Sequence, residues 1–353
     1  MNDIKIDILP KTLYFKQPAG TSRGVYLERK VWYLRMYREG RESHVAMGEI
    51  APLPNLSCDD LPNFEEIIHR FCSKFDGTIP YEMLRPYPSL LFGLETAFRQ
   101  FQNIQGGEVM PMWDTEFSRG EKGITINGLI WMGTYDEMKR RIQEKLGKGF
   151  RCIKVKIGAI DFEKEFDLLN RIRQEYSKEQ ITLRVDANGA FAPSEAMRRL
   201  EKLAALDIHS IEQPIRAGQW NEMAELCQTS PLPIALDEEL IGCNTVSEKK
   251  LLLDSIRPQY IVLKPSLHGG ISGCEEWIRL AMERNIGYWI TSALESNIGL
   301  MAIAQWAATL KIEIAQGLGT GALFKNNVPL PLEVADDKLW LRQGHDIATI
   351  LRS

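Results

Sequence analysis

The chain has 353 residues, of which 44% are hydrophobic and 25% are charged, enough for one large domain and a smaller one. Its formal net charge of -4 gives no overall attraction to nucleic acids or anionic membranes, so an anionic ligand would have to be bound locally. The six cysteines lack C-x-x-C spacing, which argues against a zinc cluster or a disulfide framework and favours reduced thiols in the cytoplasm.

The N-terminal segment MNDIKIDILPKTLYF alternates charged and apolar residues and has no continuous apolar run, unlike a signal peptide. No apolar run elsewhere approaches the roughly 20 residues that a membrane-spanning helix needs. We therefore expect a cytoplasmic protein whose partner is a small-molecule substrate, not a nucleic acid or a membrane.

Residues 1–118 are predicted to form an α+β domain, because strand-like segments come first and helical ones follow. The strand candidates are IKIDILP, RKVWYLRMY and HVAMGEIAP, and the helix candidates are LPNFEEIIHRFCSKF and PSLLFGLETAFRQF. Residues 15–24 are polar and contain glycine, which predicts a mobile loop, and a second loop follows residues 48–52. Loops of this kind often act as lids over a site.

Residues 119–322 alternate short apolar strands with amphipathic helices, and polar strand ends recur about every 25 to 30 residues, the size of a βα unit. The strand candidates are GITINGLIW, CIKVKIG, ITLRVDAN, HSIEQP, PIALDE, YIVLKP, GYWITSAL and IEIAQG. This pattern predicts an α/β fold, a (βα)8-type barrel of the modified TIM-barrel kind, capped by the N-terminal domain. A doubly wound open sheet is the alternative, but no G-x-G-x-x-G opens any of these helices. Residues 323–353 contain no further βα unit and are predicted to pack back on the capping domain.

Two lysines stand near the end of the second strand candidate. Lys154 and Lys156 lie two residues apart, so their side chains point to the same face of the strand. In a barrel that face is the interior, where repulsion and burial are expected to lower at least one lysine pKa and produce a base. The simpler alternative is a K-x-K pattern on an exposed strand.

Three carboxylates end the next three strands, at Asp186, Glu212 and Asp237. A barrel gathers its strand ends at one mouth, where three acids would repel one another unless a cation neutralised them. Oxygen ligands without His or Cys favour Mg²⁺, with Mn²⁺ also possible. Each acid alone would more often be a helix cap. Neighbouring polar groups that could orient the ligands are Asn188, Gln213 and Glu238.

Lys264 ends the sixth strand candidate, across the predicted mouth from Lys156. It could be a second base, a proton donor or a cation against an enolate or aromatic ring, or it could only neutralise the acids. Near the last two strands, a helix start and a Gly-rich turn offer free N–H groups for an anion, although most such turns are only turns. The residues concerned are Ser292, Glu295, Gly319 and Thr320.

With K-V-K-I-G, D-A-N, E-Q-P, D-E and K-P on successive strands, nearly the whole chain resembles the enolase superfamily, itself a standard example of Lys-plus-Mg²⁺ chemistry. The segments ITSALESNIGL and AQGLGTGALFKN most resemble its o-succinylbenzoate synthase family, a group of carbon–oxygen lyases of menaquinone biosynthesis. Similar motifs occur in the N-succinylamino acid racemases and dipeptide epimerases of the same superfamily.

The resemblance implies that Lys156 removes the proton α to a substrate carboxylate and then protonates the departing hydroxyl. Asp186, Glu212 and Asp237 would hold Mg²⁺ against the enediolate, and Lys264 would place its charge over the ring. The implied substrate is 2-succinyl-6-hydroxy-2,4-cyclohexadiene-1-carboxylate. Its carboxylates would be contacted by Arg23, with nearby lid residues, and by Ser292 and the turn at Gly319, where some family members have Asp.

Three other functions are considered. A racemase or epimerase would use the two facing lysines to exchange one proton in two steps. A Schiff-base aldolase would use one buried lysine against a carbonyl, but it leaves the three acids unexplained. A non-catalytic binding barrel would be expected to lose a lysine or an acid, and this chain keeps all five.

Overall fold

The computed structural model describes residues 3–21, 24–105, 108–109 and 111–343. The N-terminal cap is built on an antiparallel sheet of β1 (Ile4–Thr21), β2 (Gly24–Arg38) and β3 (Ala46–Ile50), in that order. The mobile loop predicted for residues 15–24 is wrong for 15–21, because this segment continues β1 and pairs with β2 after a register shift between Tyr14 and Ala19. Residues 22 and 23 lie outside the described part.

Three helices and a short hairpin complete the cap: α1 (Phe64–Cys72), α2 (Tyr81–Leu84), α3 (Pro88–Gln102), β4 (Ile104–Gln105) and β5 (Glu108–Val109). Helix α3 packs directly on β3, where glycine faces glycine. A Cβ on Gly48 would lie 2.1 Å from the carbonyl oxygen of Gly93, so the close approach of the two backbones requires glycine at this point. The cap thereby has its own apolar core beneath the sheet.

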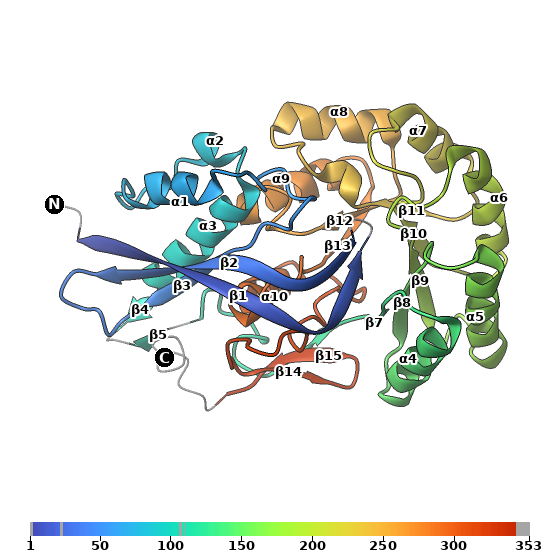
Figure 1. Ribbon diagram of the computed structural model, residues 1–353, viewed down its shortest axis with the longest axis horizontal. Helices are drawn as coiled ribbons and strands as arrows, with labels where there is room; N and C mark the ends of the chain where they lie inside the picture. The colour runs from blue at the N-terminus through green and yellow to red at the C-terminus, as the bar shows by residue number, and fades with distance from the viewer. Residues whose placement is uncertain (1–2, 22–23, 106–107, 110, 344–353) are drawn as a thin grey trace.

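The second part is a curled parallel sheet surrounded by helices (Figure 1). Its strands are β7 (Gly128–Ile130), β8 (Cys152–Lys156), β9 (Thr182–Asp186), β10 (Ser210–Glu212), β11 (Ile234–Leu236), β12 (Tyr260–Leu263) and β13 (Gly287–Ile290). They pair in chain order, as expected for a barrel and not for a doubly wound sheet. The predicted fold class is confirmed.

A helix follows each of these strands: α4 (Tyr135–Gly147), α5 (Phe162–Glu175), α6 (Pro193–Ala204), α7 (Trp220–Thr229), α8 (Val246–Ile256), α9 (Gly270–Met282) and α10 (Asn297–Thr309). A short 3₁₀ helix covers Glu238–Leu240. Local sequence sets several helix starts. Capping boxes, in which Thr and Glu side chains satisfy free N–H groups reciprocally, begin α4 at Thr134 and α8 at Thr245.

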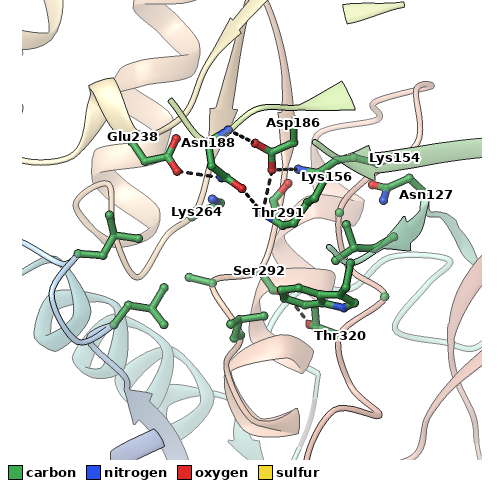
Figure 2. A pocket seen from close by; sticks show the side chains of 18 residues that line it. Asn127, Lys154, Lys156, Asp186, Asn188, Glu238, Lys264, Thr291, Ser292 and Thr320 are labelled. Atoms are coloured by element: carbon green, nitrogen blue, oxygen red, sulfur yellow. Dashed lines mark hydrogen bonds and ion pairs between the residues drawn. The ribbon is translucent and has the colours of Figure 1, made fainter. Parts of the chain in front are cut away.

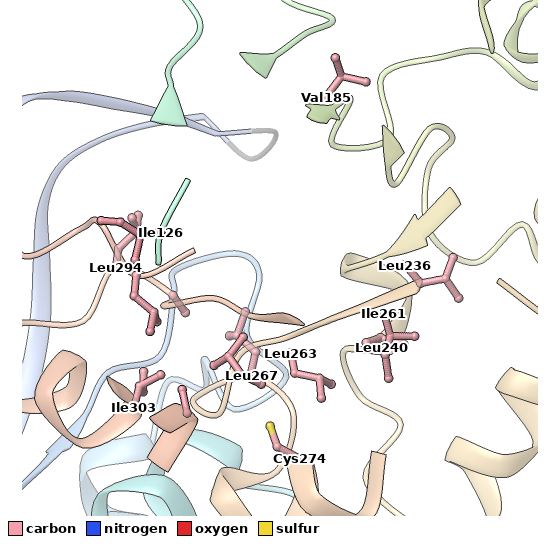
Figure 3. Packing of buried hydrophobic residues seen from close by; sticks show 14 of the residues in the cluster. Ile126, Val185, Leu236, Leu240, Ile261, Leu263, Leu267, Cys274, Leu294 and Ile303 are labelled. Carbon is pink, nitrogen blue, oxygen red and sulfur yellow. The ribbon is translucent and has the colours of Figure 1, made fainter. Parts of the chain in front are cut away.

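Side chains alternate between the barrel interior and the helix layer. On β12, Ile261 and Leu263 pack in the main core with residues such as Leu236 and Ile303 (Figure 3). Val262 instead joins Ala235 and Trp289 in a separate small cluster. This period of two means that Lys264, two residues after Val262, continues the inner row of β12.

The barrel closes with less structure than predicted. The candidate IEIAQG forms only single bridges, Ile126 with Gln316 and Thr291 with Gly317. The candidate GITINGLIW is also divided, since Ile124–Thr125 (β6) pairs outside the barrel and only β7 joins it. The prediction of eight full strands is therefore wrong by one, since the described parallel sheet has seven. Gln316 still links the two edges, because its backbone oxygen accepts from Asn127 N, next to β7, and its side-chain oxygen accepts from Ile290 N of β13.

The C-terminal segment contacts both parts of the molecule. Phe324 pairs with Phe15 of β1, their ring centroids 4.5 Å apart. Farther along, β14 (Leu332–Ala335) and β15 (Lys338–Leu341) form a hairpin whose second strand pairs with β6. The tail thus touches the cap first and then the start of the barrel region.

All six cysteines are free thiols. In the part of the chain that the structure describes, no helix combines the length and apolarity needed to cross a membrane.

Candidate active site

Strand register gathers the charged strand ends. Lys156 lies opposite Asp186 on the neighbouring strand, and Asp186 lies opposite Glu212 on the next. Asp237 directly follows β11 and Lys264 directly follows β12. Because parallel strands place their carboxyl ends on one side, all five residues meet at the same mouth.

Each lysine contacts a carboxylate. Lys156 Nζ lies 3.0 Å from Asp186 Oδ2 and 2.7 Å from Asn188 Oδ1 (Figure 2). Lys154 contacts Glu212 and lies 3.2 Å from Asp186, while Lys264 Nζ lies 2.5 Å from Asp237 Oδ2. The K-x-K pair is buried, so the exposed-strand interpretation of these lysines does not hold.

A lowered pKa was expected for at least one of Lys154 and Lys156, and Lys154 shows the opposite. Burial acts to lower the pKa of Lys154, but the charges of Asp186 and Glu212 together outweigh it and raise the pKa. At Lys264 burial again acts to lower the pKa, but the charges of Asp237 and Glu238 outweigh it and raise the pKa. Both groups are therefore held as ammonium cations, because acids from other strands lie close to each Nζ.

The acids do not all behave alike. Burial raises the pKa of Asp186, but Lys154, Lys156 and Lys264 outweigh burial and hold the pKa below its usual value. Burial and the neighbouring acids raise the pKa of Glu212 and of Glu238 to about 7. Four carboxyl groups share this site with three lysines, and the raised pKa values of Glu212 and Glu238 reflect the cost of burying all four as anions.

These acids fit a divalent cation by their chemistry, although they are not assembled around one. Among the described residues no three His, Cys, Asp or Glu side chains are grouped closely enough to hold a metal, because ammonium groups lie between the acids. One carboxylate oxygen each of Glu212, Asp237 and Glu238 is nevertheless buried and has no hydrogen-bond partner among the described residues. Unpaired carboxylate oxygens, and acids whose burial as anions is costly, both suit a hard cation such as Mg²⁺.

The polar residues beside the acids hold them in place. Asn188 accepts from Lys156 and donates to Glu238 Oε1 at 2.9 Å. Gln213 is fully buried, accepts from Asp237 N and Glu239 N, and donates to Glu239 Oε2. Asn188 (φ 44°) and Gln213 (φ 39°) both adopt left-handed backbone conformations, which non-glycine residues seldom do and which often mark functional sites.

A cavity opens in front of this cluster, and the labelled polar side chains in Figure 2 converge on it. Lys154, Lys156, Asp186, Asn188, Glu238 and Lys264 form its charged and amide lining. Its apolar lining includes Leu53 and Leu56, from the loop after β3. The second predicted loop therefore contributes to the lining of the cavity, and its action as a lid stays a prediction. A lining that is partly charged and partly apolar suits a ligand with a hydrocarbon body and anionic substituents.

Residues near the last strands divide between lining and support. Ser292, Thr320 and Gly319 line the cavity, and the hydroxyls of Ser292 and Thr320 lie 2.6 Å apart. Glu295 does not line it. Its buried carboxylate accepts from Ser266 Oγ and Ala293 N instead. Arg23 lies outside the described residues.

Sequence reasoning missed several lining residues that the strand pattern contains. Asn127, Leu129 and Trp131 all line the cavity, and they are alternate residues of GITINGLIW. Trp131 lies with its ring centroid 5.7 Å from Lys156 Nζ. Thr291 also lines the cavity, two residues after the inward Trp289. Extending the alternation of each strand to its end would have found all four.

Known proteins with this fold are similar along nearly the whole chain. The family model for the enolase C-terminal domain-like family matches residues 137–345. An o-succinylbenzoate synthase from Desulfotalea psychrophila is 43% identical over 95% of this chain and 98% of its own length. The crystal structure of MenC from the same organism has a TM-score of 0.82 and 40% identity, covering 96% of this chain and 99% of that one.

The fold is shared more widely than the sequence. The substrate-liganded L-Ala-D/L-Glu epimerase from Bacillus subtilis has a TM-score of 0.81 at only 20% identity, with 97% of both chains covered. At that identity the likeness concerns the fold alone, whereas the family model and the 43% identical relative concern the sequence itself. The chain belongs to the enolase superfamily.

Proposed function

We propose that this protein is an o-succinylbenzoate synthase, which dehydrates 2-succinyl-6-hydroxy-2,4-cyclohexadiene-1-carboxylate to 2-succinylbenzoate in menaquinone biosynthesis. The observation that carries the proposal is the 43% identity to an o-succinylbenzoate synthase over 95% of the chain. The cavity supports it, since lysines and acids share its lining with apolar side chains that suit a six-membered ring.

Lys156 is proposed as the base. The proton α to the carboxylate is very weakly acidic, and a positioned base contributes only about 10²- to 10⁴-fold to its removal. Lys156 can accept this proton only in its neutral form, and Asp186 and Asn188 now hold its ammonium group. The same amine, once protonated, can return the proton to the departing hydroxyl, whose loss leaves an aromatic ring.

Asp186, Glu212 and Asp237 are proposed to hold Mg²⁺, with Mn²⁺ as a possible substitute, and members of the superfamily generally use Mg²⁺. Bound there, the ion would supply positive charge beside the substrate carboxylate, where negative charge develops as the proton leaves. Asn188, Gln213 and Glu238 are proposed to keep the three acids oriented. Ser292, Gly319 and Thr320 are proposed to contact the substrate's carboxylates.

Lys264 is proposed to act as a cation and not as a second base. Its raised pKa and its contact with Asp237 keep it charged, and it faces the cavity from the other side of the acid cluster. A fixed positive charge over a developing aromatic ring is favourable through the ring's electron-rich face.

The direct test is a spectroscopic assay for loss of the cyclohexadiene substrate, with and without EDTA. We expect turnover that EDTA abolishes and that added Mg²⁺ restores. Absence of turnover by the folded, Mg²⁺-loaded protein would refute the proposal. A cytoplasmic location, which the free thiols favour, is part of the same proposal.

A racemase or epimerase of the same superfamily is the second candidate, favoured by lysines on two sides of one cavity. Such an enzyme would exchange the α-proton of N-succinylamino acids or dipeptides for solvent deuterium. We expect this exchange to be slow compared with dehydration, because the Lys264 ammonium would have to lose its proton in one direction. Exchange that outpaces dehydration would reverse the assignment.

A further inference from the structure

The two apolar walls of the cavity belong to different domains. One is formed by the cap segment that follows β3 and contains Leu53 and Leu56. The other is formed by the segment between β13 and α10, which includes Ala293 and Leu294. The lysines and acids all stand on the barrel, so the separation of these walls depends on how the cap is fixed to the barrel.

Arg29 on β2 joins the two walls through their backbones. Its side chain is only 2% exposed. One terminal nitrogen donates to the carbonyl oxygen of Ala293 in the barrel wall, and the other donates to that of Ala51, at the start of the cap wall. A planar guanidinium with two fixed donors sets both distances at once, which a single ammonium group cannot do.

Glu49 on β3 makes a second connection to the same barrel segment. It is fully buried, and its carboxylate accepts from Ser296 N at 2.8 Å, Ser296 Oγ at 2.6 Å and Gly299 N at 2.8 Å. The N–H groups of Ser296 and Gly299 are among the first of α10, and such groups have no partner within the helix. Burial raises the pKa of Glu49 and the nearby Glu295 adds to the rise, while the two Ser296 donors and Arg29 oppose it. A charge kept so far from water needs all of these partners.

Glu295 completes the network on the barrel side. It accepts from Ala293 N at 2.7 Å and from Ser266 Oγ at 2.5 Å. Ser266 lies two residues after Lys264, so the barrel wall is tied to the loop that carries this lysine. We call Arg29, Glu49 and Glu295, with these partners, the interdomain clasp.

We propose that Arg29 and Glu49 are positioning residues for substrate binding: through the clasp they hold the cap wall and the barrel wall at the separation that the substrate needs. Neither side chain lines the cavity. The inference rests on the proposed function for its substrate. Loosening the clasp weakens contact with ground state and transition state alike, which raises KM while kcat changes little.

The structure offers a matched control in Glu95 on α3. This buried cap carboxylate also binds the start of a barrel helix, accepting from Ile271 N at 2.6 Å and Ser272 N at 3.0 Å of α9. Neither Ile271 nor Ser272 lines the cavity. Glu49→Gln and Glu95→Gln therefore make the same chemical change in the same kind of contact, and only the first disturbs a wall.

Both variants would be assayed for dehydration with Mg²⁺ present, after circular dichroism shows them folded. We expect Glu49→Gln to raise KM about tenfold with kcat within about threefold, and Glu95→Gln to leave KM within about twofold. Arg29→Lys should resemble Glu49→Gln, because an ammonium can keep only one of the two backbone contacts. Equal KM values for the two Gln variants, or a loss confined to kcat, would overturn the proposal.

Hydrogen exchange separates failure of the clasp from failure of the proposed function. In Glu49→Gln, the amides of Ala51, Leu53, Asn55 and Leu56 and of residues 292–296 should exchange at least about tenfold faster than in the unaltered protein, and in Glu95→Gln they should not. This result does not depend on which substrate is turned over. If Glu49→Gln does not fold, Ser296→Ala removes one of the three contacts and should give the same KM and exchange changes. Unchanged exchange in these segments would also overturn the proposal.

Discussion

The side chains at the mouth of the barrel are charged, closely paired and shielded from water. Lys154, Lys156 and Lys264 each contact an acid from a neighbouring strand end. In water such pairs would contribute little, but in a buried cluster a change of one charge alters the proton affinity of every neighbour. Substitutions here should therefore affect chemistry far more than folding.

Lys156→Ala should lower kcat by about 10²- to 10⁴-fold, the contribution of a positioned base. The remaining groups would still bind substrate, so KM should change much less. Steady-state dehydration kinetics check both values. Lys154→Ala is the comparison within the same strand, and an equal or larger kcat loss there would assign the base to Lys154 instead.

Glu212→Gln should abolish measurable turnover, a loss of at least about 10³-fold, because a neutral amide weakens the site for a divalent cation. Stability should change little, since burial and neighbouring acids already raise the pKa of Glu212 to about 7 and favour its neutral form. Urea unfolding and calorimetric titration with Mg²⁺ check the two parts. Near-normal activity with intact Mg²⁺ binding would contradict the assignment of Glu212 as a ligand.

At the scale of elements, buried carboxylates from the cap bind the first turns of barrel helices. Glu95 accepts from the first turn of α9, and Glu49 accepts from the start of α10. Free N–H groups and the positive end of the helix dipole stabilise the negative charge, while burial opposes it. At Glu95 burial dominates and raises the pKa to about 7 from its ordinary value of 4.5.

Glu95 should therefore make the stability of the protein pH-dependent. Between pH 4.5 and 7 the unfolded chain loses this proton while the folded chain keeps it, so the free energy of unfolding falls as pH rises. The full effect is about 3 kcal/mol and is complete above pH 7. Urea unfolding should show the stability of the unaltered protein, relative to Glu95→Gln, declining over this range. Parallel pH profiles for the two proteins would contradict this expectation.

At the scale of the whole molecule, segments distant in sequence join the two domains. The tail segment around Phe324 runs beside β1, with Lys16 N donating to Leu323 O and Lys325 N donating to Tyr14 O, each at 2.8 Å. The rings of Phe15 and Phe324 are both buried at this junction. The tail therefore fastens the cap to the chain that closes the barrel.

Phe324→Ala should lower the free energy of unfolding by about 3 to 5 kcal/mol, because a buried ring is lost and a cavity remains. The double variant Phe15→Ala, Phe324→Ala should lose less unfolding free energy than the sum of the two single variants, since the rings share one contact. Tyr14→Ala, at a ring that is 49% exposed, should stay within about 0.5 kcal/mol. Denaturant unfolding measures all four variants, and additive effects would show that the rings are not coupled.

The sequence by itself determined the order of strands and helices, the barrel class and the charged strand ends. Period-two alternation and parallel topology suffice to bring Lys156, Asp186 and Glu212 to one mouth, because both are properties of the backbone. Superfamily membership also followed from these short motifs and was confirmed. The roles assigned to the site residues stay predictions.

Only the tertiary structure decided the features that depend on contacts between distant segments. The eighth strand is reduced to bridges at Gln316 and Gly317, and part of the first strand candidate pairs with the C-terminal hairpin. Lys154 and Lys264 remain charged, and Arg29 reaches across to the barrel wall. Local sequence specifies which side chains can be buried and how they alternate along each strand. The distance between two buried charges depends on how the whole chain packs, and that distance sets their proton affinity.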